Sequence, residues 1–135
     1  MAARSKARKR ALDILYAAEV RRESATEALE RVVREGDAPT NPYTGVLVRG
    51  VEEHRARIDE LLAEYAEGWT LDRMPAVDRN VLRLGVWELL WSDDVPPAVA
   101  VSEALGLVTE LSTDDSPQFV NGVLGSIARN RATLV

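Results

Sequence analysis

Apolar residues recur every three or four positions along most of the chain, and this spacing places them on one face of an α-helix. The pattern predicts helices over residues 5–22 and 98–111, each with one apolar stripe facing a core. Ser5 is the expected N-cap of the first of these helices. A shorter helix is expected after Ser24, because Ser24 and Glu27 have the spacing of a capping box.

Residues 43–67 form the longest predicted helix. Asn41 and Pro42 have the chemistry of a capped helix start, and Gly68 can end the helix in the left-handed conformation. Val51 and Ile58 are seven residues apart and lie on the same helical face, with His54 between them, so one continuous helix is expected. The positions expected to face inward in the short helix and in this one are Ala28, Leu29, Val32, Val33, Val46, Leu47, Gly50, Val51, Ile58, Leu61, Leu62 and Tyr65.

The segment after Pro75 is apolar on more than one side of a helix, so it is expected to be the central, buried helix. A single turn is expected just before it at residues 70–74, and the acidic and proline pairs at residues 93–97 end it. A last helix is predicted from Ser116 to about Arg131. No series of strands competes, so the pattern predicts an all-α bundle of about six or seven helices.

Length and composition set limits on this bundle. With 135 residues and 46% hydrophobic content, the chain fits one compact domain over residues 1–135. It has no cysteine, which excludes disulfides and cysteine zinc sites and suits a reducing cytoplasm. No apolar stretch approaches the roughly 18 residues of a membrane span, and the basic start lacks the apolar core of a signal peptide. We therefore expect a cytoplasmic protein.

Charge is distributed unevenly between the start of the chain and the rest. The first ten residues contain five basic side chains and no acid, whereas the remainder contains twelve Lys or Arg against all 22 Asp or Glu. Such asymmetry is typical of a protein that meets a polyanion at one place and repels it elsewhere. Nucleic acid is the natural candidate for that polyanion.

Catalytic chemistry finds little support in the sequence. The single histidine, His54, has no visible partner and is expected at the core margin or the surface. Asp114 and Asp115 precede a predicted helix, where acids favour the helix dipole, so they do not require a metal ion. There is no phosphate-binding glycine loop, nucleophile elbow or dinucleotide fingerprint. The sequence predicts a protein that is not an enzyme and that holds no cofactor or metal.

The most specific motif lies in the last predicted helix. The run Phe119-Val120-Asn121-Gly122-Val123-Leu124, preceded by the acidic-Ser pair Asp115-Ser116, resembles the signature of the NusB family of transcription antitermination factors. From the residues alone, Asn121 is expected to place a buried amide against a neighbouring backbone group. Further segments resemble the same family at the right spacings: Ala7-Arg8, Ala11-Leu12, Leu15-Tyr16, Val77-Asp78-Arg79, Leu82-Arg83, Trp87-Glu88-Leu89, Asp94-Val95-Pro96 and Glu103-Ala104.

The resemblance implies a fold, a function and two sets of site residues. It implies about seven helices in two packed subdomains, which bind boxA RNA of nascent ribosomal transcripts together with NusE, a ribosomal small-subunit protein. That complex helps RNA polymerase to resist termination. By analogy the residues expected to bind single-stranded RNA are Arg4, Lys6, Arg8, Lys9, Gln118 and Phe119. Those expected to bind NusE are Tyr16, Asp72, Asp78 and Asp115.

Departures from the family pattern and two alternatives qualify this interpretation. The family often has a basic residue where this chain has Gln118, and a charged pair where it has Gly125-Ser126, so we predict modest RNA affinity alone and tighter binding with NusE. One alternative is a helical scaffold that self-associates through Trp69 and Trp91 without RNA. The other is a relative of the RNA-binding module of ribosomal RNA cytosine methyltransferases. A homodimer is compatible with RNA binding unless it covers the basic helix.

Overall fold

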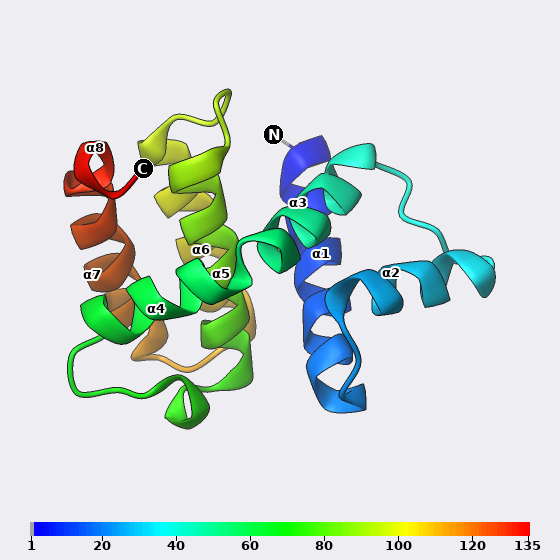
Figure 1. Cartoon of the computed structure of the whole chain (residues 1–135), viewed down its shortest axis with the longest axis horizontal. Coiled ribbons are helices and arrows are strands. Elements are labelled where there is room, and N and C mark those ends of the chain that lie inside the picture. Colours follow the sequence, from blue (N-terminus) through cyan, green and yellow to red (C-terminus); the bar gives the residue numbers. More distant parts are fainter. Residues whose placement is uncertain (1) are drawn as a thin grey trace. The chain divides into compact units, whose positions relative to one another are not determined.

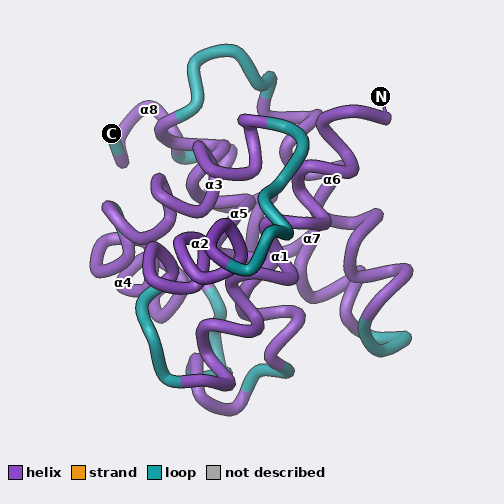
Figure 2. The backbone as a smooth tube through the Cα atoms, turned by 90° about the vertical axis from the view of Figure 1, so that its right-hand side faces the viewer, coloured by secondary structure: helices purple, strands orange, loops and turns teal. Residues whose placement is uncertain are grey.

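A computed structural model describes the backbone of residues 2–135 and the side chains from Ala3 onward. Within these residues the chain forms helices joined by short loops and has no strand (Figure 2). The all-α prediction is therefore confirmed. The chain divides into two compact units, the first ending at His54 and the second running from Arg55 to Val135 (Figure 1). Whether the two units make one domain stays a prediction.

The first unit is a three-helix arrangement in which every helix contacts the other two. It consists of α1 (Ala2–Arg21), α2 (Ala25–Arg34) and α3 (Pro42–Glu53). The predicted apolar stripe of the first helix is confirmed, because its members are all buried: Ala7, Ala11, Leu12, Leu15 and Ala18. Small alanines on this stripe allow the neighbouring helices to approach α1 closely.

Two helix starts in this unit have the caps that the sequence predicts. The Ser24 hydroxyl accepts the Glu27 backbone N–H at 3.0 Å, and the Glu27 carboxylate accepts the Ser24 N–H at 2.8 Å. The Asn41 side-chain oxygen accepts the Tyr43 N–H at 2.9 Å, with Pro42 in the first turn of α3. These bonds satisfy backbone donors that a helix start otherwise leaves open.

Three local predictions for this unit are wrong. Ser5 is not an N-cap, because the helix already begins at Ala2 and the Ala, Arg and Lys residues around Ser5 are strong helix formers. Val33 and Val46 do not face inward, since they are 52% and 46% exposed. A small unit has too little interior to cover every apolar residue, so some valines stay at its surface.

The long helix predicted over residues 43–67 is interrupted. It splits at His54, a half-buried residue with φ −106° and ψ 16°, into α3 and α4 (Arg55–Tyr65). Helix α3 packs on α1 and α2, whereas α4 packs on α5 and α7. Val51 and Ile58 keep the same helical register on either side of His54, so periodicity alone does not reveal that the two halves pack in different units. Gly68 has a φ of +81° in the turn after α4, as predicted.

The second unit is built around one buried helix. After α4, the 3₁₀ turn η1 (Leu71–Arg73) leads into α5 (Ala76–Trp91), which contacts α4, α6, α7 and α8. Every residue from Asn80 to Leu90 is buried, so the predicted central helix is confirmed. At Gly85 an added Cβ would lie 2.7 Å from Leu124 Cδ1, so glycine leaves room for this buried side chain.

The rest of the unit covers α5. It comprises α6 (Pro97–Leu111), α7 (Ser116–Arg129) and α8 (Arg131–Leu134), so the last predicted helix is divided at Asn130. Asn121 is exposed on α7, which corrects the expectation of a buried amide. Its position faces outward, so solvent satisfies the amide without a protein partner. None of the described helices combines the length and the apolar character needed to cross a membrane.

Candidate nucleic-acid interface

The basic residues of α1 divide into accessible and packed side chains. Lys6 and Lys9 are exposed, and Arg4 is exposed with its guanidinium carbon 4.1 Å from the centre of the Tyr43 ring. Arg8 is only 5% exposed, and its guanidinium carbon lies 5.7 Å from the same ring centre. An arginine over an aromatic face is held by a cation–π interaction. The side chain of Arg8 is thus largely covered, unlike those of Lys6 and Lys9, and its contact with RNA stays a prediction.

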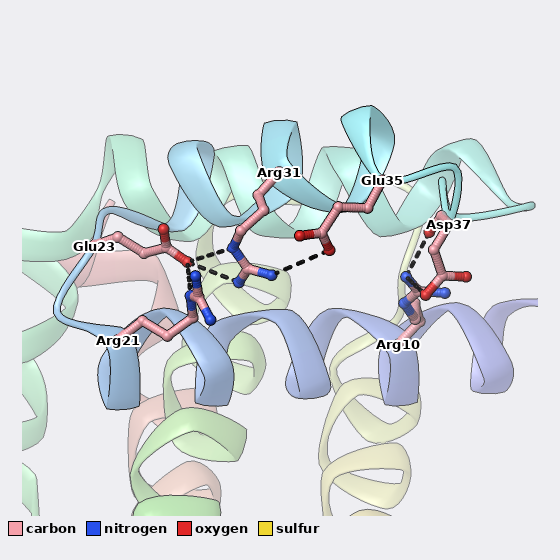
Figure 3. A network of polar contacts seen from close by, with 6 residues as sticks. All are labelled: Arg10, Arg21, Glu23, Arg31, Glu35 and Asp37. Carbon is pink, nitrogen blue, oxygen red and sulfur yellow. Dashed lines mark hydrogen bonds and ion pairs between the residues drawn. The ribbon is translucent and has the colours of Figure 1, made fainter.

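Arg10 connects α1 to the loop before α3. Its Nη2 donates to the backbone carbonyl of Asp37 at 2.7 Å and lies 3.2 Å from the Asp37 carboxylate (Figure 3). The side chain of Arg10 is 30% exposed in this arrangement. The bond to a carbonyl fixes the loop beside the basic half of α1, and it leaves part of the guanidinium open to solvent.

A second polar cluster joins the other end of α1 to α2. Arg31 lies 2.7 Å from the Glu23 carboxylate and 3.7 Å from Glu35, while Arg21 approaches Glu23 at 3.4 Å (Figure 3). The hydrogen bond from Arg31 lowers the pKa of the Glu23 carboxyl below its ordinary value. Arg21 and Arg31 are thus paired with acids at this end of the first unit.

A groove of about 430 Å³ runs along that basic half. One wall is α1 and the other is the chain that leads into α3. We call it the α1–α3 groove and define it by the residues that line it: Ala3, Lys6, Ala7, Arg10, Thr40, Asn41, Pro42 and Thr44. The sequence predicts the α1 wall from its basic residues. It does not predict the opposite wall, because residues 40–44 are distant from α1 in the sequence and contain no Lys or Arg.

In the second unit Asp78 is the centre of a hydrogen-bond cluster. It is 3% exposed, and its two carboxylate oxygens accept the hydroxyls of Ser112 at 2.5 Å and Ser116 at 2.8 Å. We call these three residues the Asp78 cluster. It joins the start of α5 to the turn between α6 and α7, where Asp115 is exposed at the N-cap position. Asp78 is therefore enclosed by hydroxyls, and its contact with a partner stays a prediction.

The other residues predicted to bind a protein partner are accessible. Tyr16 is 44% exposed on α1, one turn before Val20, which is 66% exposed. Asp72 is exposed in η1, a turn held by two bonds from the Arg79 guanidinium to the carbonyls of Leu71 (2.7 Å) and Met74 (2.9 Å). A half-exposed tyrosine beside an exposed valine has the amphipathic character of an interface anchor.

Two aromatic rings meet at the start of α7. Phe119 is half-buried and its ring centre lies 5.9 Å from that of Trp69, with the ring planes inclined by 56°. Trp69 is 48% exposed, and Gln118 beside Phe119 is exposed. The sequence analysis predicts that Phe119 binds RNA, whereas it considers Trp69 only for self-association. Trp91 is half-buried, so it offers less surface than Trp69 for the self-association considered from the sequence.

Comparisons with known proteins show the family of this chain. Residues 5–129 match the NusB family. The chain belongs to the NusB family. It is 72% identical to a transcription antitermination protein NusB of Nocardioides sp. over 99% of both chains, and 64% identical to that of Saccharopolyspora erythraea over 99% of this chain and 95% of the relative. The family is one of transcription antitermination proteins and not of enzymes.

Solved structures give the same result for the fold. The structure of T. maritima NusB matches with a TM-score of 0.85 and 36% identity, covering 96% of this chain and 92% of the other. A NusB chain solved with NusE and double-stranded RNA matches with a TM-score of 0.82 and 31% identity, covering 96% and 98%. The NusB-like fold predicted from the sequence is therefore confirmed. The alternative of a methyltransferase module receives no support, because these NusB relatives match along nearly their whole length.

The residues predicted to bind RNA come from both units. Arg4, Lys6 and Lys9 form an accessible basic surface at the start of α1, in the first unit. Gln118 and Phe119 lie together at the start of α7, in the second unit. No group of His, Cys, Asp and Glu side chains among the described residues is arranged to hold a metal ion.

Proposed function

We propose that this NusB-family chain binds boxA-like single-stranded RNA of nascent ribosomal transcripts together with NusE, and thereby helps RNA polymerase to resist termination. The observation that carries the proposal is the accessible basic surface of Arg4, Lys6 and Lys9 on an otherwise acidic chain. Cations at a helix N-terminus oppose the helix dipole, so their concentration there is best explained by an anionic ligand. Since antitermination acts on transcribing polymerase, we infer that the protein works in the cytoplasm.

The second unit supports a role for a protein partner. Exposed Asp72 and Asp115 offer negative charge, which complements a basic protein surface, steers association and fixes orientation. Tyr16 adds an amphipathic anchor from the first unit. A related NusB has been solved with NusE and double-stranded RNA. NusE is therefore the partner we propose, and RNA affinity is expected to be modest alone and tighter in its presence.

The test measures binding of a fluorescent boxA-like RNA by anisotropy at two salt concentrations, with and without NusE. A double-stranded form of the same RNA is included, because the related complex contains duplex RNA. Partner-enhanced binding of the single strand that weakens with salt is the expected result, with a slope of about 0.7 per phosphate contacted. Absence of binding under all conditions would overturn the proposal.

A pair of charge-reversed variants makes this test specific. Lys6→Glu with Lys9→Glu is expected to weaken RNA binding by about a hundredfold or more, since two accessible cations become repulsive to phosphate. The matched control is Arg34→Glu with Arg57→Glu, which changes the net charge equally at exposed positions outside α1. Equal losses in the two double variants would show that net charge, and not the α1 surface, controls binding.

A self-associating helical scaffold is the second candidate, favoured by the exposure of Trp69 and Val20. Light scattering across a range of protein concentrations, with and without RNA, separates the two. A dimer that forms and does not bind RNA favours the scaffold. RNA binding, by the monomer or by the dimer, favours the antitermination role.

A further inference from the structure

A second groove of the first unit lies between α2 and α3, and its walls are mostly apolar. Its volume is about 280 Å³, just below the roughly 300–1,000 Å³ that is common for small-molecule pockets. It therefore suits side chains of a partner protein better than a complete small molecule. We call it the α2–α3 groove and define it by the residues that line it: Leu29, Val33, Ala38, Pro39, Asn41, Pro42, Gly45 and Arg49.

Two exposed valines continue the apolar surface of this groove. Val33 stands in its α2 wall, and Val46 lies on α3 one turn after Pro42 and one turn before Arg49. Both valines fit the apolar period of their helices, yet the core of the first unit does not cover them. Exposed apolar residues that gather beside a groove mark an interaction site. A partner that fills the groove also buries the two valines.

Arg49 gives the groove its chemical selectivity, because it is the only charged residue among those that line it. Its guanidinium lies over Gly45, where an added Cβ would be 2.7 Å from Arg49 Nη1. Within the described part of the chain, no hydrogen bond or ion pair engages this guanidinium. A guanidinium presents five donors in a planar fork that matches a carboxylate. An apolar wall with an unpaired arginine at one end therefore favours a ligand that carries an acid next to apolar groups.

Both ends of the groove are fixed by hydrogen bonds of the folded unit. At the Arg49 end, the Glu52 carboxylate accepts the Thr26 backbone N–H at 3.2 Å and joins the start of α2 to the last turn of α3. At the opposite end, the Asn41 side chain caps α3. Walls that are held in place before binding reduce the entropy that association costs.

We propose that the α2–α3 groove docks an amphipathic helix of a partner protein, with apolar side chains between Val33 and Pro42 and an Asp or Glu paired with Arg49. Pro42 and Arg49 are two turns apart, about 10 Å along α3. The partner helix therefore presents two apolar residues one turn apart and an acid a further turn away, which is the usual spacing of helix-in-groove binding.

This surface goes beyond the proposed function, because none of its residues is among those predicted to bind RNA or NusE. The groove also suits protein better than RNA. RNA binding depends on several contacts between cations and phosphates, and the groove offers one cation in a mostly apolar wall.

The probe is a designed alanine-rich peptide of about 15 residues, the length at which an isolated helix begins to form. It carries two leucines one turn apart, with a glutamate one turn before and another one turn after them, so that either direction of docking is possible. Two matched peptides carry glutamine or lysine in place of both glutamates. Heteronuclear NMR titrations of the full chain give the affinity of each peptide and show which backbone signals it shifts.

The glutamate peptide is expected to shift signals of the groove and to bind about three- to fivefold more tightly than the glutamine peptide, as a partly exposed ion pair does. The lysine peptide should bind most weakly. Arg49→Gln should abolish the difference between the glutamate and glutamine peptides. The matched control is Arg22→Gln, which removes the same charge at an exposed position outside the groove and should preserve the difference.

A second variant displaces Arg49 without removing its charge. Gly45→Ala replaces a glycine within α3 by a better helix former, so the helix is retained. The added methyl group pushes the guanidinium aside, because the two would otherwise be too close. The preference for glutamate should therefore decrease, and circular dichroism checks that the fold is unchanged.

Three results would overturn the proposal. One is equal affinity for the three peptides, or shifts confined to another surface. Another is a loss of boxA-like RNA binding in Arg49→Gln as large as that in the double variant of Lys6 and Lys9, which would assign Arg49 to RNA. The third is a dimer, measured by light scattering, that Arg49→Gln dissociates, because the groove would then hold a second copy of this chain. The peptide titrations do not depend on whether the natural chain binds RNA.

Discussion

The helices of the two units are held together by different kinds of contact. In the first unit ten basic and nine acidic residues nearly balance, whereas the second has seven basic residues against 13 acidic ones. The first unit joins its helices through caps, ion pairs and bonds to carbonyls, such as that from the Thr44 hydroxyl to Ala7 at 3.0 Å. The second surrounds one apolar helix, α5, with the others.

This difference shows where each unit can carry a ligand. A helix with an uncovered polar side, such as α1, leaves cations and a groove at the surface. A helix that is buried on all sides cannot do so, and the second unit therefore presents its candidate residues from turns and helix starts. The Asp78 cluster is the polar exception inside that unit, and it fixes one of these turns.

The largest expected effect compares two leucines that are both fully buried, Leu82 in α5 and Leu47 in α3. Leu82→Ala should lower the free energy of unfolding by about 2–5 kcal/mol, toward the upper end, because a helix surrounded by neighbours relaxes little around a cavity. Leu47→Ala should cost less, since α3 has two neighbours in its unit. Urea unfolding followed by circular dichroism measures both, and a larger loss at Leu47 would contradict the comparison.

The next effect concerns the Asp78 cluster. Asp78→Ala leaves two hydroxyls without their acceptor and should cost about 1–3 kcal/mol. Asp115→Ala removes an exposed acid and should stay within about 0.5 kcal/mol. The same two proteins are then tested for NusE binding. Restoration of binding by Asp78→Asn, which keeps an acceptor oxygen, would identify Asp78 as a positioning residue.

A smaller effect is expected at the capping box of the first unit. Ser24→Ala removes a hydroxyl that accepts a backbone N–H, and it should cost about 1 kcal/mol. Thr70 occupies the N-cap position of η1 without a side-chain bond, so Thr70→Ala serves as the control and should cost much less. Thermal unfolding of both variants measures the loss of stability. Equal losses for Ser24→Ala and Thr70→Ala would show that the side-chain cap at Ser24 does not stabilise α2.

The smallest effect is the pH dependence of the pair formed by Glu23 and Arg31. Because the folded pKa of Glu23 is lowered, the pair stabilises the fold above the ordinary carboxyl pKa of 4.5, and this contribution is lost as pH falls through the lowered value. Glu23→Gln should therefore be less stable than the natural chain at pH 7, and the difference should shrink near pH 3. A difference that is constant with pH would exclude the ion pair as its source.

Much of the fold could be predicted from local patterns. The capping box at Ser24, the start of α3 at Asn41 and the central position of α5 all follow from residues close in sequence. The misplaced features, such as the break at His54 and the exposure of Val46, depend on which core each helix face meets. The periodicity of apolar residues does not show which core each helix face packs against.

The candidate site shows the same division. The sequence by itself determined the family, the helical fold and the basic start of α1, because motif spacing, periodicity and charge are properties of neighbouring residues. Only the tertiary structure decided that Arg8 packs on Tyr43, that Asp78 is enclosed by hydroxyls, and that Asn41 stands across a groove from Lys6. The two serines that bind Asp78 are 34 and 38 positions away in the chain. Contacts between such distant residues depend on how the helices pack, and not on the preferences of neighbouring residues.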